Sequence, residues 1–149
     1  MAGAAPTGRI LALDYGRRRI GMAVSDDLGL TAQGLVTFER STIRDDLRRL
    51  TELAAARNIS LIVIGDPLHM NGKQGRQSEQ VREFAGRLAE RTGLPVKLWD
   101  ERWTTVVAQR VLRESGISSR KRARAVDRLA AVLLLENYLE WRSHQQSGE

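Results

Sequence analysis

The sequence contains no cysteine, which excludes disulfide bonds and thiolate metal sites. It has only two histidines, His69 and His144, so a histidine-rich zinc site is not expected either. A bound metal would therefore need oxygen ligands, as magnesium and manganese do. No apolar run approaches the roughly 20 residues that span a bilayer, and residues 1–8 lack the features of a signal peptide. These absences predict a cytoplasmic protein without a membrane partner.

Aromatic residues are scarce, at 5% of the chain, yet hydrophobic residues reach 42%, which suffices for the core of a globular protein. The length of 149 residues suits a single domain. Acidic residues are outnumbered, since 18 Asp and Glu face 24 Lys and Arg and the net charge is +6. This balance favours an anionic partner, nucleic acid before a membrane surface.

The apolar pattern predicts a sheet with helices packed against it. Continuous apolar runs bounded by glycine and polar residues predict five strands, over residues 10–13, 20–24, 34–38, 61–65 and 96–99. Apolar residues at helical spacing predict helices over residues 43–57, from the polar loop at 66–75 to about 92, from 104 or 105 to 115, and from 118 or 119 to about 142.

This order of elements predicts an α/β fold with a single five-stranded mixed sheet flanked by helices. The first three strands form an antiparallel meander, and the others are parallel. We expect one domain over residues 9–142, between a flexible tail at 1–8 and a polar tail at 143–149.

Three of the predicted strands run into acidic residues. Asp14 follows the first strand, Asp66 the fourth, and Asp100 and Glu101 the fifth. Because ligands gather at the carboxyl ends of strands in such sheets, we expect these acids to lie along one edge. A buried carboxylate is costly unless cations or hydrogen bonds compensate it, which favours a functional role. The alternative for Asp14 is a turn-forming residue that bonds its own backbone.

A fourth acid, Asp127, interrupts the apolar face of the last helix. Its neighbours at helical spacing are small or apolar, namely Ala130, Ala131, Leu134 and Tyr138. Aspartate is rarely buried without a partner, so Asp127 should either join the acids at the sheet edge or pair with Arg124 or Arg128.

Four motifs, in this order, resemble the YqgF family, described as Holliday junction resolvases of the RNase H-like superfamily. They are Leu13–Gly16 with Arg19–Asp26, Gly65–Gly72, Asp100–Thr105 and Val126–Leu134. With them the resemblance extends over about residues 13–139, nearly the whole chain. It implies a nuclease, and the role usually given for the family is processing of the 5′ end of the 16S rRNA precursor.

Carried over by position, the resemblance implies that Asp14, Glu101 and Asp127 are the catalytic and metal-binding acids. Two magnesium or manganese ions about 3.5–4 Å apart can activate water and neutralise charge at phosphorus. Asp14 would bridge them, and the other two acids would each complete one side. Asp100 is the alternative to Glu101. The chain departs from the family at Asp66, in place of an apolar residue, and at His69, in place of Asn. Asp66 is therefore a possible additional ligand.

Basic residues near these motifs predict sequence-neutral contacts with phosphates. They are Arg17, Arg18, Arg19, Lys73 and Arg76, extended by Arg102, Arg120, Lys121 and Arg122. The alternative for each is surface solubility. Trp99 and Trp103 flank the acidic pair; an exposed one would stack on an unpaired base, whereas Trp99, which continues a strand, is expected in the core.

Other functions remain open at this point. Proteins of the actin and sugar-kinase superfold also begin with a hairpin that binds phosphate. Those proteins need two such domains, however, and this chain has the length of one. We therefore expect no nucleotide cofactor. A non-catalytic nucleic-acid-binding module would have the same fold, although all three acids are retained. Within the nuclease reading, the substrate is an rRNA precursor or a four-way DNA junction. Symmetric cleavage of a junction would require a homodimer.

Overall fold

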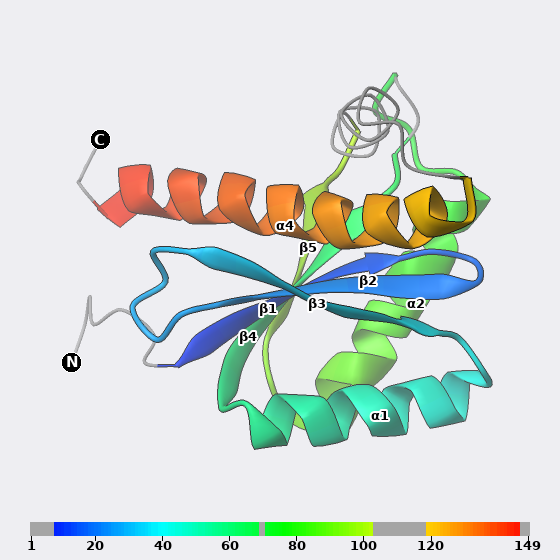
Figure 1. The fold of residues 1–149 in the computed structure, drawn as a ribbon, viewed down its shortest axis with the longest axis horizontal. Coiled ribbons are helices and arrows are strands. Elements are labelled where there is room, and N and C mark those ends of the chain that lie inside the picture. Colours follow the sequence, from blue (N-terminus) through cyan, green and yellow to red (C-terminus); the bar gives the residue numbers. More distant parts are fainter. Residues whose placement is uncertain (1–7, 69–70, 103–118, 147–149) are drawn as a thin grey trace.

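The structure, a computed structural model, describes residues 8–68, 71–102 and 119–146 (Figure 1). Its centre is one five-stranded sheet with the order β3-β2-β1-β4-β5. The strands are β1 (Arg9–Tyr15), β2 (Arg19–Ser25), β3 (Ala32–Glu39), β4 (Ile59–Asp66) and β5 (Val96–Asp100). β1 and β3 pair antiparallel with β2, whereas β1 with β4 and β4 with β5 are parallel. This confirms the predicted mixed sheet with an initial antiparallel meander.

Helices cover both faces of the sheet. The helices are α1 (Ile43–Ala56), α2 (Arg76–Thr92) and α4 (Ser119–Gln146). Figure 1 shows α4 crossing one face, with α1 and α2 on the other. Each face has its own core: Leu11 and Leu13 of β1 pack with the α1–α2 side, and Ile10 and Ala12 pack with α4. Because side chains alternate along a strand, the next even position of β1 falls on the α4 side. That position is Asp14.

The ends of the helices follow local signals. Thr42 caps α1 by accepting a hydrogen bond from the backbone N of Asp45 at 3.1 Å, as predicted. α2 ends at Gly93, whose φ of 73° is left-handed and therefore suits glycine. α4 continues to Gln146, so the predicted end of this helix near residue 142 is too early. Residues 143–146 are polar, but none is a helix breaker, and the helix extends through them.

Two predicted segments fall largely outside the described residues. They are the tail over 1–8, of which only Gly8 is described, and the helix predicted from 104 or 105 to 115. None of the helices in the described ranges is long and apolar enough to cross a membrane.

Candidate active site

The carboxyl ends of three parallel strands lie next to one another at one edge of the sheet. The register pairs Leu13 of β1 with Ile64 of β4, and Asp66 of β4 with Asp100 of β5. Asp14 therefore lies beside Gly65, and Glu101 follows immediately after β5. The acids that the sequence places at strand ends thus do gather along one edge.

Glu101 turns toward Asp14, and the two carboxyl groups form a hydrogen bond. The close approach is possible because the intervening residue of β4 is Gly65: a Cβ atom there would overlap Oε2 of Glu101. The backbone N–H of Glu101 also donates to the carbonyl of Asp66 at 3.3 Å, which fixes the chain at this point.

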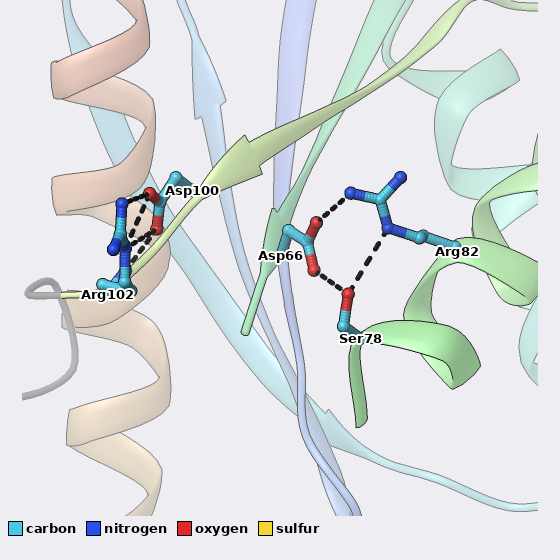
Figure 2. Close-up of polar contacts among 5 residues, drawn as sticks. All are labelled: Asp66, Ser78, Arg82, Asp100 and Arg102. Atoms are coloured by element: carbon cyan, nitrogen blue, oxygen red, sulfur yellow. Dashed lines mark hydrogen bonds and ion pairs between the residues drawn. The ribbon is translucent and has the colours of Figure 1, made fainter. Parts of the chain in front are cut away.

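Asp100 does not share the partner of Glu101 but pairs with Arg102 instead. Its Oδ2 lies 2.7 Å from Nη2 of Arg102, and 40% of its side chain is exposed. Figure 2 shows this pair beside α4, apart from the cluster around Asp66. Of the two adjacent acids, the structure brings Glu101 and not Asp100 into contact with Asp14.

The Asp14–Glu101 pair holds its protons more tightly than ordinary carboxyl groups do. Burial raises the pKa of Asp14 to about 6, and the charge of Asp127 adds to this, while the hydrogen bond from Glu101 lowers it. The pKa of Glu101 is raised to about 9. Burial is the largest cause, and the charge of Asp14 and the hydrogen bond between the two groups raise it further. Two crowded carboxyl groups that resist full ionisation share a proton near neutral pH. A cation at this point would favour their charged forms.

Asp127 reaches the same region from α4. In the sheet, Gly21 of β2 is the register partner of Asp14, and a Cβ at Gly21 would overlap the carbonyl oxygen of Asp127. Glycine at this position therefore lets the helix lie directly on the strand next to Asp14. Burial raises the pKa of Asp127, against the opposing effect of Arg19.

The partner of Asp127 is Arg19, on β2. The Arg19 Nε donates to Oδ2 of Asp127 at 2.8 Å, and both side chains are partly buried. An ion pair was one of the alternatives predicted for Asp127, but the partners expected on its own helix lie elsewhere. Arg124 pairs with Glu39 at 3.5 Å, and the stem of Arg128 packs over Gly34.

Within residues 8–68, 71–102 and 119–146, no three Asp, Glu or His side chains lie close enough together to form a metal-binding group. Asp14 and Glu101 are in contact, but Asp127 is engaged by Arg19. The donor chemistry nevertheless fits magnesium or manganese, since hard carboxylate oxygens are crowded together from rigid elements.

The fourth strand-end acid, Asp66, has a different environment (Figure 2). Its Oδ1 accepts from the Ser78 hydroxyl at 2.6 Å and its Oδ2 from Nη2 of Arg82 at 2.7 Å. Only 3% of the residue is exposed. Both oxygens of the candidate additional ligand are therefore bound to α2, and its main effect on the acids is its charge, which helps to raise the pKa of Glu101.

The predicted phosphate-binding residues divide into groups. Arg17, Arg18, Lys73, Arg76 and Lys121 are exposed. Arg19 and Arg102 are engaged with acids, as described. The side chains of Arg120 and Arg122, like residues His69 and Trp103, are outside the described part of the chain. Trp99 packs against Tyr138 and Trp141, with ring centroids 5.3 and 5.4 Å away. It is partly buried and lies against the core on the α4 side, so the prediction that it belongs to the core is confirmed only in part.

Sequence reasoning missed a pair that holds the turn after Asp14. Asp46 of α1 is fully buried and accepts from the backbone N of Ser41 at 3.0 Å and from Nε of Arg40 at 3.4 Å. The same guanidinium donates to the carbonyls of Gly16 at 3.0 Å and Arg17 at 3.3 Å. The only sequence signal is an acid in the first turn of a helix, where it also suits the helix dipole.

Comparisons with known proteins identify a matching family and similar proteins. The family described as "RuvX: Holliday junction resolvase" matches residues 8–141. A protein of Koribacter versatilis (strain Ellin345), named "Putative pre-16S rRNA nuclease", is 54% identical over 135 residues, which is 91% of this chain and 88% of the relative. A protein of the same name from Heliobacterium modesticaldum (strain ATCC 51547 / Ice1) is 44% identical over 141 residues, covering 95% of each chain.

Solved structures of resolvases have the same fold. RuvC of T. thermophilus in complex with a Holliday junction substrate aligns with a TM-score of 0.56 at 14% identity, over 91% of this chain and 96% of its own. The Fowlpox virus resolvase with its Holliday junction DNA also gives 0.56 at 14% identity, over 90% of this chain and 98% of its own. At this level of identity, the likeness concerns the fold alone.

Proposed function

The chain belongs to the RuvX family of Holliday junction resolvases, a family of nucleases, and we propose that it is a divalent-metal-dependent endonuclease that processes the 5′ end of the 16S rRNA precursor. The name of the relatives, which are 54% and 44% identical over most of their length, supports this substrate. The observation that carries the proposal is the contact between Asp14 and Glu101 at the carboxyl edge of the sheet. Asp127 on α4 is near enough for its charge to raise the pKa of Asp14.

In this proposal, Asp14, Glu101 and Asp127 hold the metal. Bound magnesium or manganese would supply an activated water and neutralise the charge that develops at phosphorus. The carboxyl groups of Asp14 and Glu101 would hold the cation in their charged forms, which a nearby positive charge favours. Arg19 keeps Asp127 oriented toward the sheet.

Exposed cations around the acids would bind the substrate. Arg17 and Arg18 lie on the turn directly after β1, Lys73 lies in the loop before α2, and Arg76 is the first residue of α2. Contacts from such side chains to backbone phosphates give affinity without sequence preference and with a strong salt dependence.

The test compares the wild type with Asp14→Asn on a 16S rRNA precursor fragment, single-stranded RNA and a four-way DNA junction. Each reaction is run with magnesium, with manganese and with a chelator. We expect metal-dependent cleavage of the rRNA precursor by the wild type and loss of cleavage in Asp14→Asn. Glu136→Gln is the matched control, since Glu136 is an exposed acid on α4 and its change should leave cleavage intact.

Junction resolution is the second candidate, and the description of the matching family favours it. Preferred cleavage of the four-way junction would support it, and symmetric cuts would require a dimer in solution. A protein that binds these nucleic acids with a steep salt dependence but cuts none of them would instead be a binding module of the same fold.

A further inference from the structure

A positively charged hollow of about 460 Å³ lies next to the candidate active site. It is bounded by the turn after β1 and by the segment that joins β3 to α1. Its lining residues are Arg17, Arg18, Arg19, Glu39, Arg40 and Ser41. The lining has four guanidinium groups and one carboxylate, that of Glu39, which also pairs with Arg124 on α4. Arg19 and Arg40 are paired with Asp127 and Asp46, so Arg17 and Arg18 supply the excess positive charge. The hollow is therefore suited to an anion.

The wall of the hollow is held in place before any ligand arrives. The backbone N of Arg40 donates to the carbonyl of Arg18 at 2.7 Å. Its guanidinium donates to the carbonyls of Gly16 and Arg17 and contacts Asp46, which is fully buried. The face of Tyr15 lies 4.2 Å from the same guanidinium. A binding surface that is ordered in advance loses less entropy when it binds.

One side chain belongs both to the hollow and to the group of acids. Arg19 lines the hollow, and its Nε holds Asp127 at 2.8 Å. A guanidinium has five N–H donors in a fixed planar arrangement, and this bond uses one of them. An anion that binds Arg19 in the hollow would therefore be held at a fixed position relative to Asp127.

We propose that this hollow is the subsite for a backbone phosphate next to the scissile bond. The inference rests on the proposed nuclease function and adds to it the β3–α1 segment as part of the substrate path, with Ser41 at the rim. The ligand class is the phosphodiester backbone of RNA or DNA, which carries no base information. Arg19 sets the spacing between this phosphate and the acids.

The test changes the charge at Ser41. Ser41 bonds Asp46 through its backbone N–H, so Ser41→Asp and Ser41→Lys both keep that bond. Both are made in the Asp14→Asn background, so that binding is measured without cleavage. The probes are a single-stranded RNA of the precursor 5′ region and a four-way DNA junction, titrated over a range of salt concentrations.

We expect Ser41→Asp to weaken binding of the preferred probe by about threefold to tenfold and Ser41→Lys to tighten it by a similar factor. The slope of log K against log salt should steepen by about 0.7 to 0.9 for the added lysine. The matched controls are Ser143→Asp and Ser143→Lys, at an exposed position near the end of α4, and these should change affinity by no more than about twofold.

The possible failures are distinguishable. If the parent protein binds a probe with clear salt dependence but both Ser41 variants match their Ser143 controls, the phosphate path lies elsewhere and only the subsite is overturned. If the parent binds neither RNA nor junction, the proposed function falls and the subsite with it. Thermal unfolding of each variant verifies that the comparison is between folded proteins.

Discussion

Two glycines control how closely the acids approach one another. Gly65 leaves room for the carboxyl group of Glu101, and Gly21 leaves room for the backbone of α4 at Asp127. In both places a Cβ atom would overlap an atom of the opposing residue. At Gly21 that atom belongs to the backbone of α4, so relieving the overlap would require the whole helix to shift.

For Gly65→Ala we expect a folded protein with a displaced Glu101. Because a misplacement of about 1 Å can cost roughly 100-fold in rate, cleavage should fall by about one to two orders of magnitude. Gly86→Ala is the control, since nothing lies within 4 Å of a Cβ there. It should keep full activity and gain about 0.5–1 kcal/mol from the better helix propensity of alanine. Equal activity in the two variants would contradict the assigned role of Gly65.

The raised pKa values of the acids also predict how stability depends on pH. The folded-state values of about 6 for Asp14 and about 9 for Glu101 exceed the ordinary values of 3.8 and 4.5. Between about pH 4 and pH 9, the folded protein therefore binds more protons than the unfolded chain. The free energy of unfolding consequently decreases as the pH rises through this range.

Neutral replacements should remove this loss of stability. At pH 8 and without metal, we expect Asp14→Asn and Glu101→Gln to raise the free energy of unfolding by roughly 1–3 kcal/mol. At pH 4 the difference from the wild type should be small, because both acids are then protonated. Chemical denaturation at the two pH values measures this, with Glu136→Gln as the exposed control. If neither variant is more stable than the wild type at pH 8, this would contradict the conclusion that burial and mutual repulsion raise the pKa values of Asp14 and Glu101.

At the scale of elements, the turn between β1 and β2 depends on its link to α1. Arg40 joins the turn carbonyls to Asp46, which has no exposed surface. Removing one partner of a buried charge pair leaves the other uncompensated, which costs about 3–5 kcal/mol. We expect a loss of this order for Arg40→Met by denaturant titration.

The double variant Arg40→Met with Asp46→Leu should recover part of that stability, because the buried charge is then gone. Arg44→Met, at an exposed position of α1, serves as control. A double variant less stable than Arg40→Met alone would contradict this, because it would show that Asp46 stabilises the fold through its bond to the Ser41 backbone N–H even without Arg40.

Most of the elements could be predicted from the sequence, because buried strands and amphipathic helices leave clear patterns. The convergence of Asp14 with the acids at the end of β5 followed from parallel strands that end at one edge. The sequence could not decide whether Asp100 or Glu101 contacts Asp14, because the regular alternation of side-chain direction along the strand ends at this point. The pair Arg19–Asp127 joins residues 108 positions apart, and no local pattern identifies such a contact. The extent of α4 was underestimated because its last turn is polar.

At the scale of the whole molecule, the protein has a net positive charge, but the half-buried acids Asp14 and Glu101 lie together at one edge of the sheet. A metal bound there would favour the folded state, because only this state brings Asp14 and Glu101 together. Magnesium at about 100 times its dissociation constant should stabilise the protein by about 2.7 kcal/mol. Thermal unfolding with and without magnesium measures this, and Asp14→Asn should lose the effect. Equal stabilisation of the variant would place the bound ion elsewhere.

The central claim is that Glu101, together with Asp14 and Asp127, carries out phosphodiester cleavage. The most direct measurement compares Glu101→Gln with Asp100→Asn in metal-dependent cleavage of the 16S rRNA precursor. The two acids are adjacent, but only Glu101 contacts Asp14, whereas Asp100 pairs with Arg102. We predict that Glu101→Gln abolishes cleavage and that Asp100→Asn retains most of it. Retained cleavage in Glu101→Gln, or its loss in Asp100→Asn alone, would contradict the proposed active site.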